Sequence, residues 1–148
     1  MRLAIHEAKQ AGLGGDVPVG AVLVCDEKVV CKTQNQRQRL LDPTAHAEVL
    51  ALRKGASFFN SWHIEGTLYV TQEPCTMCAG ALVNARVKRV VYGCKSPKSG
   101  AVHSLYQITE DKRLNHQPEV LGGVLEEECS KVLSDFFEGI RKSKKEQK

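Results

Sequence analysis

The stretch "GTLYVTQEPCTMCAGALVNARVKRVVYGC", residues 66–94, decides the fold of this chain. It opens with a β-rich run that Pro74 ends, continues at helical length with small and apolar residues, and closes with a second β-rich run. A helix between two strands predicts a parallel pair in an α/β sheet. The apolar middle of each run fits strands that are buried on both faces.

The residues before this stretch add antiparallel strands. Residues 2–12 predict a short helix, and two β-rich runs, 17–24 and 28–34, predict a hairpin around the turn Asp26-Glu27. Together with the parallel strands, the hairpin makes the expected sheet mixed. The segment 118–124, "PEVLGGV", is a further candidate strand.

Two more helices are expected. One begins near Ala45, and Gly55 is interpreted as its stop signal. The clearest is the last, because its apolar residues recur with helical spacing on one face. They are Leu125, Cys129, Val132, Leu133, Phe136, Phe137 and Ile140.

Length and composition limit the possible classes of protein. A chain of 148 residues with 42% hydrophobic residues predicts a single domain over residues 1–148 with an ample core. No stretch approaches the ~18 apolar residues of a membrane span, and no signal peptide is recognisable. We therefore expect a cytoplasmic protein without membrane contact, in which the six cysteines are metal ligands or buried thiols rather than disulfides.

The net charge of +4 resides in residues 141–148, "RKSKKEQK", which hold five Lys or Arg and one Glu. This basic end of the last helix can contact phosphates, and a solvated, frayed terminus is the alternative.

Two short motifs predict a metal site. In "EPCTMCAG", Cys75 and Cys78 open a helix, where the helix dipole stabilises thiolates. In "DPTAHAE", His46 also lies at a helix start and can supply an imidazole. Two thiolates and one imidazole suit Zn²⁺. Glu48 is too close along the helix to share the ligand role with His46, so it is free to act as a base on a zinc-activated water.

A closed structural zinc site is the alternative, and it needs a fourth protein ligand. None of the remaining cysteines and histidines has a metal-binding spacing with His46, Cys75 and Cys78. Cys31, Cys94 and Cys129 fit core thiols better. An H-x-E motif with P-C-x-x-C, its first cysteine 29 residues after the histidine, is the known signature of zinc-dependent nucleobase deaminases.

The chain resembles the bacterial tRNA-specific adenosine deaminases almost from end to end. The matching segments are "DVPVGAVLV", "DPTAHAE", "TLYVTQEPCTMCAGALVNARVKRVVYG", "SLYQI", "LNH" and "GVLEEECSKVLSDFF". The resemblance implies a cytidine-deaminase-like, three-layer α/β/α sandwich with a mixed five-stranded sheet. It also implies one Zn²⁺ per chain on His46, Cys75 and Cys78, Glu48 as proton shuttle, and a homodimer that acts on the wobble adenosine of a tRNA anticodon stem-loop.

The same resemblance implies residues that contact the RNA. Asn35 matches an asparagine at the target nucleoside, Lys98 and Asn115 match positions near the anticodon loop, and Phe137 matches a position on the final helix beside the RNA. Each has a structural alternative, as a turn residue, a solvated lysine, a cap or a core aromatic. Ser96 departs from the family, which usually has an acidic residue there. We therefore expect deamination with altered substrate choice.

Two other functions compete with this one. A free-base or nucleoside deaminase of guanine or cytidine type shares both motifs, but a small substrate does not require the long basic helix that ends the chain. A zinc-stabilised RNA-binding protein without chemistry would have no use for an uncoordinated Glu48.

Overall fold

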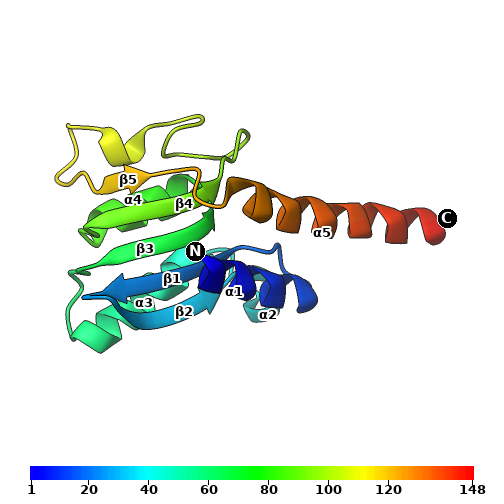
Figure 1. The fold of residues 1–148 in the computed structure, drawn as a ribbon, viewed down its shortest axis with the longest axis horizontal. Helices are drawn as coiled ribbons and strands as arrows, with labels where there is room; N and C mark the ends of the chain where they lie inside the picture. Colours follow the sequence, from blue (N-terminus) through cyan, green and yellow to red (C-terminus); the bar gives the residue numbers. More distant parts are fainter.

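The structure is a computed structural model that describes residues 1–148, and its centre is a five-stranded mixed sheet. The strands have the order β2-β1-β3-β4-β5 (Figure 1). Their bounds are β1 Gly20–Cys25, β2 Lys28–Gln34, β3 Thr67–Gln72, β4 Arg89–Cys94 and β5 Glu119–Leu121. β1 pairs antiparallel with β2 and β3, whereas β3, β4 and β5 run parallel. The predicted mixed sheet and the parallel pair of residues 66–94 are confirmed.

Helices cover both faces of this sheet. The helices are α1 Arg2–Leu13, α2 Arg37–Leu40, α3 Ala47–Phe59, α4 Thr76–Asn84 and α5 Glu126–Glu146, with a 3₁₀ turn at Ile108–Glu110. Figure 1 shows α1 in front of the sheet and α3 and α4 behind it. The larger core lies between the sheet and α3 and α4, and a smaller one joins Ile5 of α1 and Cys129 of α5 to Cys94 of β4. The expected three-layer α/β/α sandwich is confirmed.

The prediction that Gly55 stops a helix is wrong. α3 continues through Gly55 and ends at Phe59, where Asn60 takes the left-handed conformation with φ 51°. Gly55 is buried, and a Cβ built on it would lie 2.6 Å from the Cδ2 atom of Leu23 in β1. Glycine is required here because the helix packs closely on the sheet.

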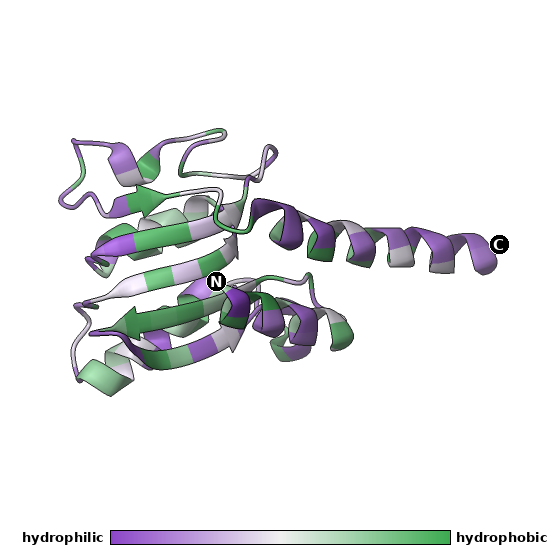
Figure 2. Ribbon diagram, in the orientation of Figure 1, coloured by the Kyte–Doolittle hydropathy of each residue, from purple (hydrophilic) through white to green (hydrophobic).

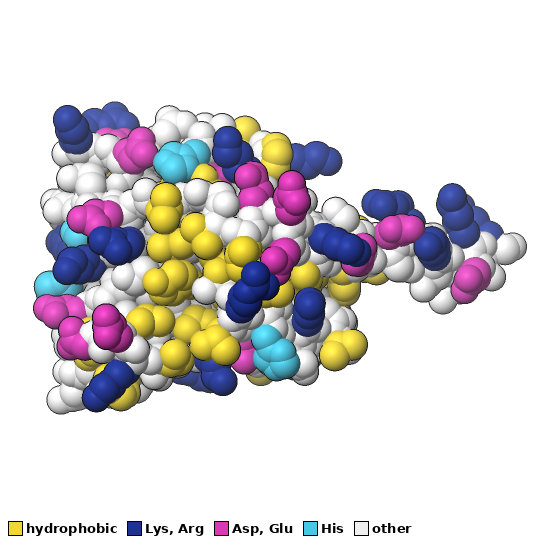
Figure 3. Space-filling model, in the orientation of Figure 1, with side chains coloured by type: hydrophobic (Ala, Val, Ile, Leu, Met, Phe, Trp, Pro, Cys, Tyr) yellow, Lys and Arg dark blue, Asp and Glu magenta, His cyan; other side chains and the backbone are white.

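The last helix, α5, covers the sheet with its first turns only and then projects from the body of the molecule (Figure 1). Cys129 is buried, and Val132, Leu133 and Phe136 are half-buried. Phe137 is 42% exposed and Ile140 37% exposed, so the predicted apolar face is only partly covered. The projecting end is mainly hydrophilic (Figure 2), and Lys and Arg side chains lie along it (Figure 3). No helix has the length and apolar character that a membrane span needs.

Candidate metal centre

The predicted metal ligands lie where two helices begin at one end of the sheet. His46 is the N-cap residue of α3, and Cys75 is the N-cap residue of α4. Cys75 follows the carboxyl end of β3 after a connection of two residues, which is the edge of an open α/β sheet where ligands bind. Thr33 of β2 donates a hydrogen bond from Oγ1 to the carbonyl oxygen of Ala47, 2.7 Å away. This bond ties the start of α3 to the sheet and holds His46 in place.

The three ligand atoms form a compact group. His46 Nδ1 lies 3.6 Å from Cys75 Sγ and 3.5 Å from Cys78 Sγ, and all three atoms lie within 4.8 Å of one another. Both helices direct the positive end of their dipole at this point. One imidazole and two sulfurs form a soft donor set that fits Zn²⁺. No other cysteine or histidine joins this group.

The electrostatics of the group favour a thiolate. Hydrogen bonding from Cys78, together with His46, lowers the pKa of Cys75 to about 4. The same bond and burial raise the pKa of Cys78, and hydrogen bonding to Cys75 raises the pKa of His46. These shifts favour a thiolate on Cys75 beside the imidazole of His46. A divalent cation that binds here would take the place of the protons on these ligands.

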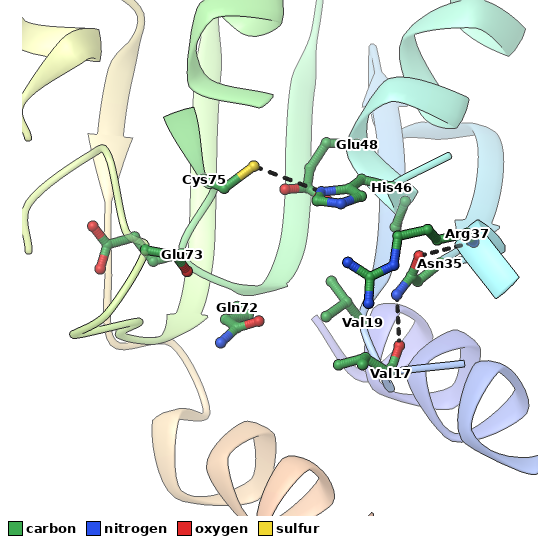
Figure 4. Close-up of a pocket in the computed structure, with 11 residues that line it drawn as sticks. Val17, Val19, Asn35, Arg37, His46, Glu48, Gln72, Glu73 and Cys75 are labelled. Atoms are coloured by element: carbon green, nitrogen blue, oxygen red, sulfur yellow. Dashed lines mark hydrogen bonds between the residues drawn. The ribbon is translucent and has the colours of Figure 1, made fainter. Parts of the chain in front are cut away.

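Glu48 lies beside the ligand group in the first turn of α3. It is only 4% exposed, and burial raises the pKa of its carboxyl group. It lines a pocket together with His46 and Cys75, and Figure 4 shows its side chain close to both. A buried carboxylate with a raised pKa at the wall of a pocket is suited to take up and release protons.

The pocket has a volume of about 120 Å³ and opens at the same end of the sheet. This is below the ~300–1,000 Å³ that is typical of drug-sized ligand sites, so it suits one small planar group rather than a large molecule. Its lining residues come from five parts of the chain. They are Val17, Val19, Asn35, Arg37, His46, Ala47, Glu48, Gln72, Glu73, Cys75 and Ser99.

Asn35 and Arg37 form the wall opposite Cys75 (Figure 4). Asn35 is 7% exposed. Its Nδ2 atom donates to the carbonyl oxygen of Val17 at 3.1 Å, and its Oδ1 atom accepts from the backbone N–H of Arg37 at 3.2 Å. Each atom can make one further hydrogen bond, because an amide has two donors and an acceptor with two lone pairs. The sequence did not single out Arg37, which belongs to the short and unpredicted helix α2.

Glu73 is a second residue that the sequence reasoning missed. It precedes Pro74 in the quoted motif, is 3% exposed, and lines the pocket. Burial would raise the pKa of its carboxyl group, but hydrogen bonds from Ser104 and from backbone N–H groups outweigh burial and hold the pKa at about 2. The signal available in the sequence was an acidic residue directly before the cysteine motif, with nothing to show what it contacts.

The loop after β4 carries two of the predicted RNA contacts. Ser96 is 5% exposed, and its hydroxyl group lies 2.7 Å from that of Ser99, so Ser96 reaches the pocket rim only through its neighbour. Lys98 is exposed between them.

Asn115 is exposed and lies away from this group. The next two residues, His116 and Gln117, line a separate hollow with Cys25 and Arg86. This hollow adjoins the starts of β3 and β4, which is the end of the sheet opposite the metal ligands. Phe137 is on α5, which projects beyond the end of the sheet where the pocket lies (Figure 1). The structure therefore brings together His46, Glu48, Cys75, Cys78 and Asn35, and leaves Asn115 and Phe137 apart from them.

Comparisons with known proteins show that the chain is similar to deaminases. The chain matches the family of MafB19-like deaminases over residues 1–141. A relative from Bacillus subtilis (strain 168), named tRNA-specific adenosine deaminase, is 47% identical over 146 residues, which cover 98% of this chain and 91% of the relative. A solved structure from studies of A-to-I editing by tRNA:A34 deaminases at the wobble position of transfer RNA has a TM-score of 0.87 and 42% identity. The match covers 90% of this chain and 97% of the chain in that structure.

A guanine deaminase from Bacillus subtilis is also similar, but over less of the chain. Its solved structure has a TM-score of 0.61 and 37% identity, and the match covers 64% of this chain and 61% of that one.

Proposed function

The chain belongs to the tRNA-specific adenosine deaminases, and on this premise we propose that it converts adenosine to inosine at the wobble position of a tRNA anticodon by hydrolytic deamination. The observation that carries the proposal is the extent of the match. Among solved structures, the one from the tRNA:A34 deaminase studies matches 90% of this chain at 42% identity with a TM-score of 0.87. The guanine deaminase from Bacillus subtilis matches 64% at 37% identity with a TM-score of 0.61, and one from Nitrosomonas europaea matches 90% at only 17% identity. Because tRNA is the proposed substrate, we expect the chain to act in the cytoplasm.

We propose that His46, Cys75 and Cys78 hold one zinc ion per chain. The proposal is supported by the three clustered ligand atoms, by the soft donor set and by the low pKa of Cys75. When bound, zinc supplies Lewis acidity that lowers the pKa of a water towards ~7. Two thiolates and a neutral imidazole balance the charge of the ion, so the site tolerates it without further anions.

Glu48 is the proposed proton shuttle. Its carboxylate accepts a proton from the attacking water and delivers it to a ring nitrogen of the base. It later helps to protonate the amino group, which leaves as ammonia. The raised pKa of Glu48 supports both roles. A carboxylate with a raised pKa is a stronger base than a solvent-exposed carboxylate, and its protonated form can then donate the proton to the substrate.

The pocket volume supports a single extruded base as the reacting group. Bases in an anticodon loop are unpaired or easily unstacked, so flipping one out costs less than opening a duplex. We propose that Asn35 contacts the target nucleoside with its remaining hydrogen-bonding capacity, and that Ser96, Lys98 and Phe137 contact the RNA around it. Lys98 and Phe137 are exposed, as a direct contact requires, whereas Ser96 is buried and would act through Ser99, to which its hydroxyl group is hydrogen-bonded.

We further propose that the chain works as a homodimer, with RNA contacts from both subunits. Asn115 lies at the opposite end of the sheet from the metal ligands of its own chain. In a homodimer it can instead contact RNA that is bound at the partner's site. This assembly gives Asn115 a role that one chain alone does not.

The test is incubation with total tRNA, followed by sequencing for adenosine-to-inosine changes at anticodon wobble positions. Parallel assays use free guanine and free cytidine. We expect inosine at wobble positions and no reaction of either free substrate. Guanine or cytidine turnover without inosine in tRNA would favour the small-molecule deaminase, and zinc retention without any turnover would favour a binding protein.

A further inference from the structure

Glu73 is a buried carboxylate at the pocket for which the proposed reaction has no use. It follows the last residue of β3 and precedes the metal-ligand segment by one residue, Pro74. Its side chain is 3% exposed, and Figure 4 shows it on the side of the pocket away from Asn35. A buried charge is tolerated only when hydrogen bonds compensate it, so its partners indicate what it does.

Every hydrogen-bond partner of the Glu73 side chain belongs to one loop, residues 96–104. Oε1 accepts from the backbone N–H of Ser96 at 3.1 Å and from the hydroxyl group of Ser104. Oε2 accepts from the backbone N–H groups of Val102 at 3.2 Å, His103 at 2.8 Å and Ser104 at 2.9 Å. Both ends of the loop are therefore held by one side chain.

The loop and the carboxylate are in tight contact. A Cβ atom on Gly100 would collide with both carboxylate oxygens of Glu73, so a larger residue at position 100 would displace the loop or the carboxylate. The backbone N–H of Ala101 donates to the carbonyl oxygen of Pro74 at 2.8 Å, and Gly100 forms a β-bridge with Cys75. The loop is therefore held against the segment that carries the metal ligand.

Glu73 does not fit the role of a second proton shuttle. Its two oxygens accept five hydrogen bonds, and all five donors are from the protein. A carboxylate offers about four lone-pair sites in total, so five donors leave no acceptor site for a substrate or water proton. The function of Glu73 must therefore act through the loop that it holds.

The loop contributes the pocket wall and an exposed cation. Ser99 lines the pocket, and Lys98 extends into solvent next to it. We propose that Glu73 is a positioning residue that holds the loop 96–104 in the conformation that presents Lys98 and Ser99 to the RNA. The proposal rests on the proposed function, because it takes RNA as the ligand of the loop.

The test is a double-mutant cycle with Glu73→Gln and Lys98→Ala. The glutamine side chain would be neutral and would turn an N–H₂ group towards backbone donors, which frees the loop. We expect KM for an anticodon stem-loop to rise by about fivefold or more, the range that one or two lost buried hydrogen bonds imply. We expect kcat to stay within about twofold, because Glu48 and the metal ligands are unchanged.

The cycle separates positioning from general stability. In the wild-type background Lys98→Ala should raise KM, and in the Glu73→Gln background it should change KM little, because the lysine is no longer held in place. Val87→Ala is the matched control: it opens a cavity in the core at the far end of β4, and KM should not change below its melting temperature. Gly100→Ala disturbs the same contact from the loop side and should reproduce the KM effect of Glu73→Gln.

A second readout does not depend on RNA. Trypsin should cut after Lys95 and Lys98 faster in Glu73→Gln than in wild type or Val87→Ala, with the zinc content unchanged. Fully additive effects of Glu73→Gln and Lys98→Ala on KM, loss of zinc, or unchanged cleavage of the loop would each overturn the proposal. If the wild type does not deaminate the stem-loop, the proposed function fails, and the cleavage rates still decide whether Glu73 holds the loop.

Discussion

At the scale of single residues, the spacing of His46 and Glu48 has a simple physical explanation. α3 begins between them, so His46 lies outside the helix with extended backbone angles, whereas Glu48 lies in the first helical turn. Two residues that are two apart inside a helix point in different directions. The change of backbone conformation at the N-cap lets both side chains reach one site, with the imidazole at the metal ligands and the carboxylate at the pocket wall.

Glu48 and Cys75 should respond differently to substitution. Glu48→Ala should keep zinc and lose turnover by about 10²–10⁴-fold, the usual contribution of general acid–base catalysis. Cys75→Ala should lose both zinc and turnover. Metal analysis and single-turnover rates on an anticodon stem-loop measure the two effects. An active Glu48→Ala enzyme would contradict the proton-shuttle role.

Ser96 is the position where substrate choice can be tested. An aspartate there would add a charged acceptor for a ribose 2′-OH, and hydrogen bonds to charged acceptors are stronger than those to a neutral hydroxyl. Ser96→Asp should therefore increase the preference for an RNA stem-loop over a DNA stem-loop of the same sequence. The measurement is the ratio of kcat/KM for the two substrates, and an unchanged ratio would rule out this role for Ser96.

At the scale of elements, the close packing of α3 on β1 depends on Gly55. Gly55→Ala should destabilise the fold by about 1–3 kcal/mol, because the new methyl group meets Leu23 in a full core. The controls are Gly80→Ala in α4 and Gly139→Ala in α5, where an added Cβ meets nothing within 4 Å. These two should stabilise their helices by about 0.5–1 kcal/mol. Urea unfolding of the three variants gives the comparison, and equal effects would refute a packing role for Gly55.

The projecting end of α5 is an element without partners in the chain, and its charge can be tested separately. Lys144, Lys145 and Lys148 form no ion pair. Replacing all three by Gln should weaken binding of an anticodon stem-loop and reduce the salt dependence of log K by up to about 0.7 for each lost phosphate contact. The control replaces Lys28, Lys32 and Lys54, which are exposed on β2 and α3. An identical slope in both triple variants would show that the tail is only solvated.

At the scale of the whole molecule, the metal site joins α3 and α4, which lie on the same face of the sheet. Metal binding should therefore stabilise the fold in addition to its role in the reaction. An ion that binds only the folded chain shifts the unfolding equilibrium towards the folded state. Chelation should lower the melting temperature and abolish turnover, and added zinc should restore both. Cys75→Ala should show no change in melting temperature with the chelator. A wild-type melting temperature that does not respond to chelator would exclude a bound ion at this site.

How well the sequence predicts a part of this fold depends on whether the pattern for that part lies within one continuous segment. The β-rich and apolar runs of residues 66–94 were enough to predict two parallel strands and their helix, since these patterns reflect burial along one segment. Gly55 was misinterpreted because a glycine that ends a helix and one that packs against a strand look the same in sequence. α2 was missed because four residues are too few to show a helical pattern.

The sequence by itself determined the sheet and singled out the proposed metal ligands and the proposed base, because each is encoded in motifs and periodic patterns that need no partner to be recognised. Only the tertiary structure decided which segments surround them. Glu73 and the loop 96–104 are separated by more than 20 residues in the sequence. Arg37 and His46 come from different segments and line the same pocket. Such contacts depend on how the sheet and helices bring distant segments together, and no local pattern specifies them.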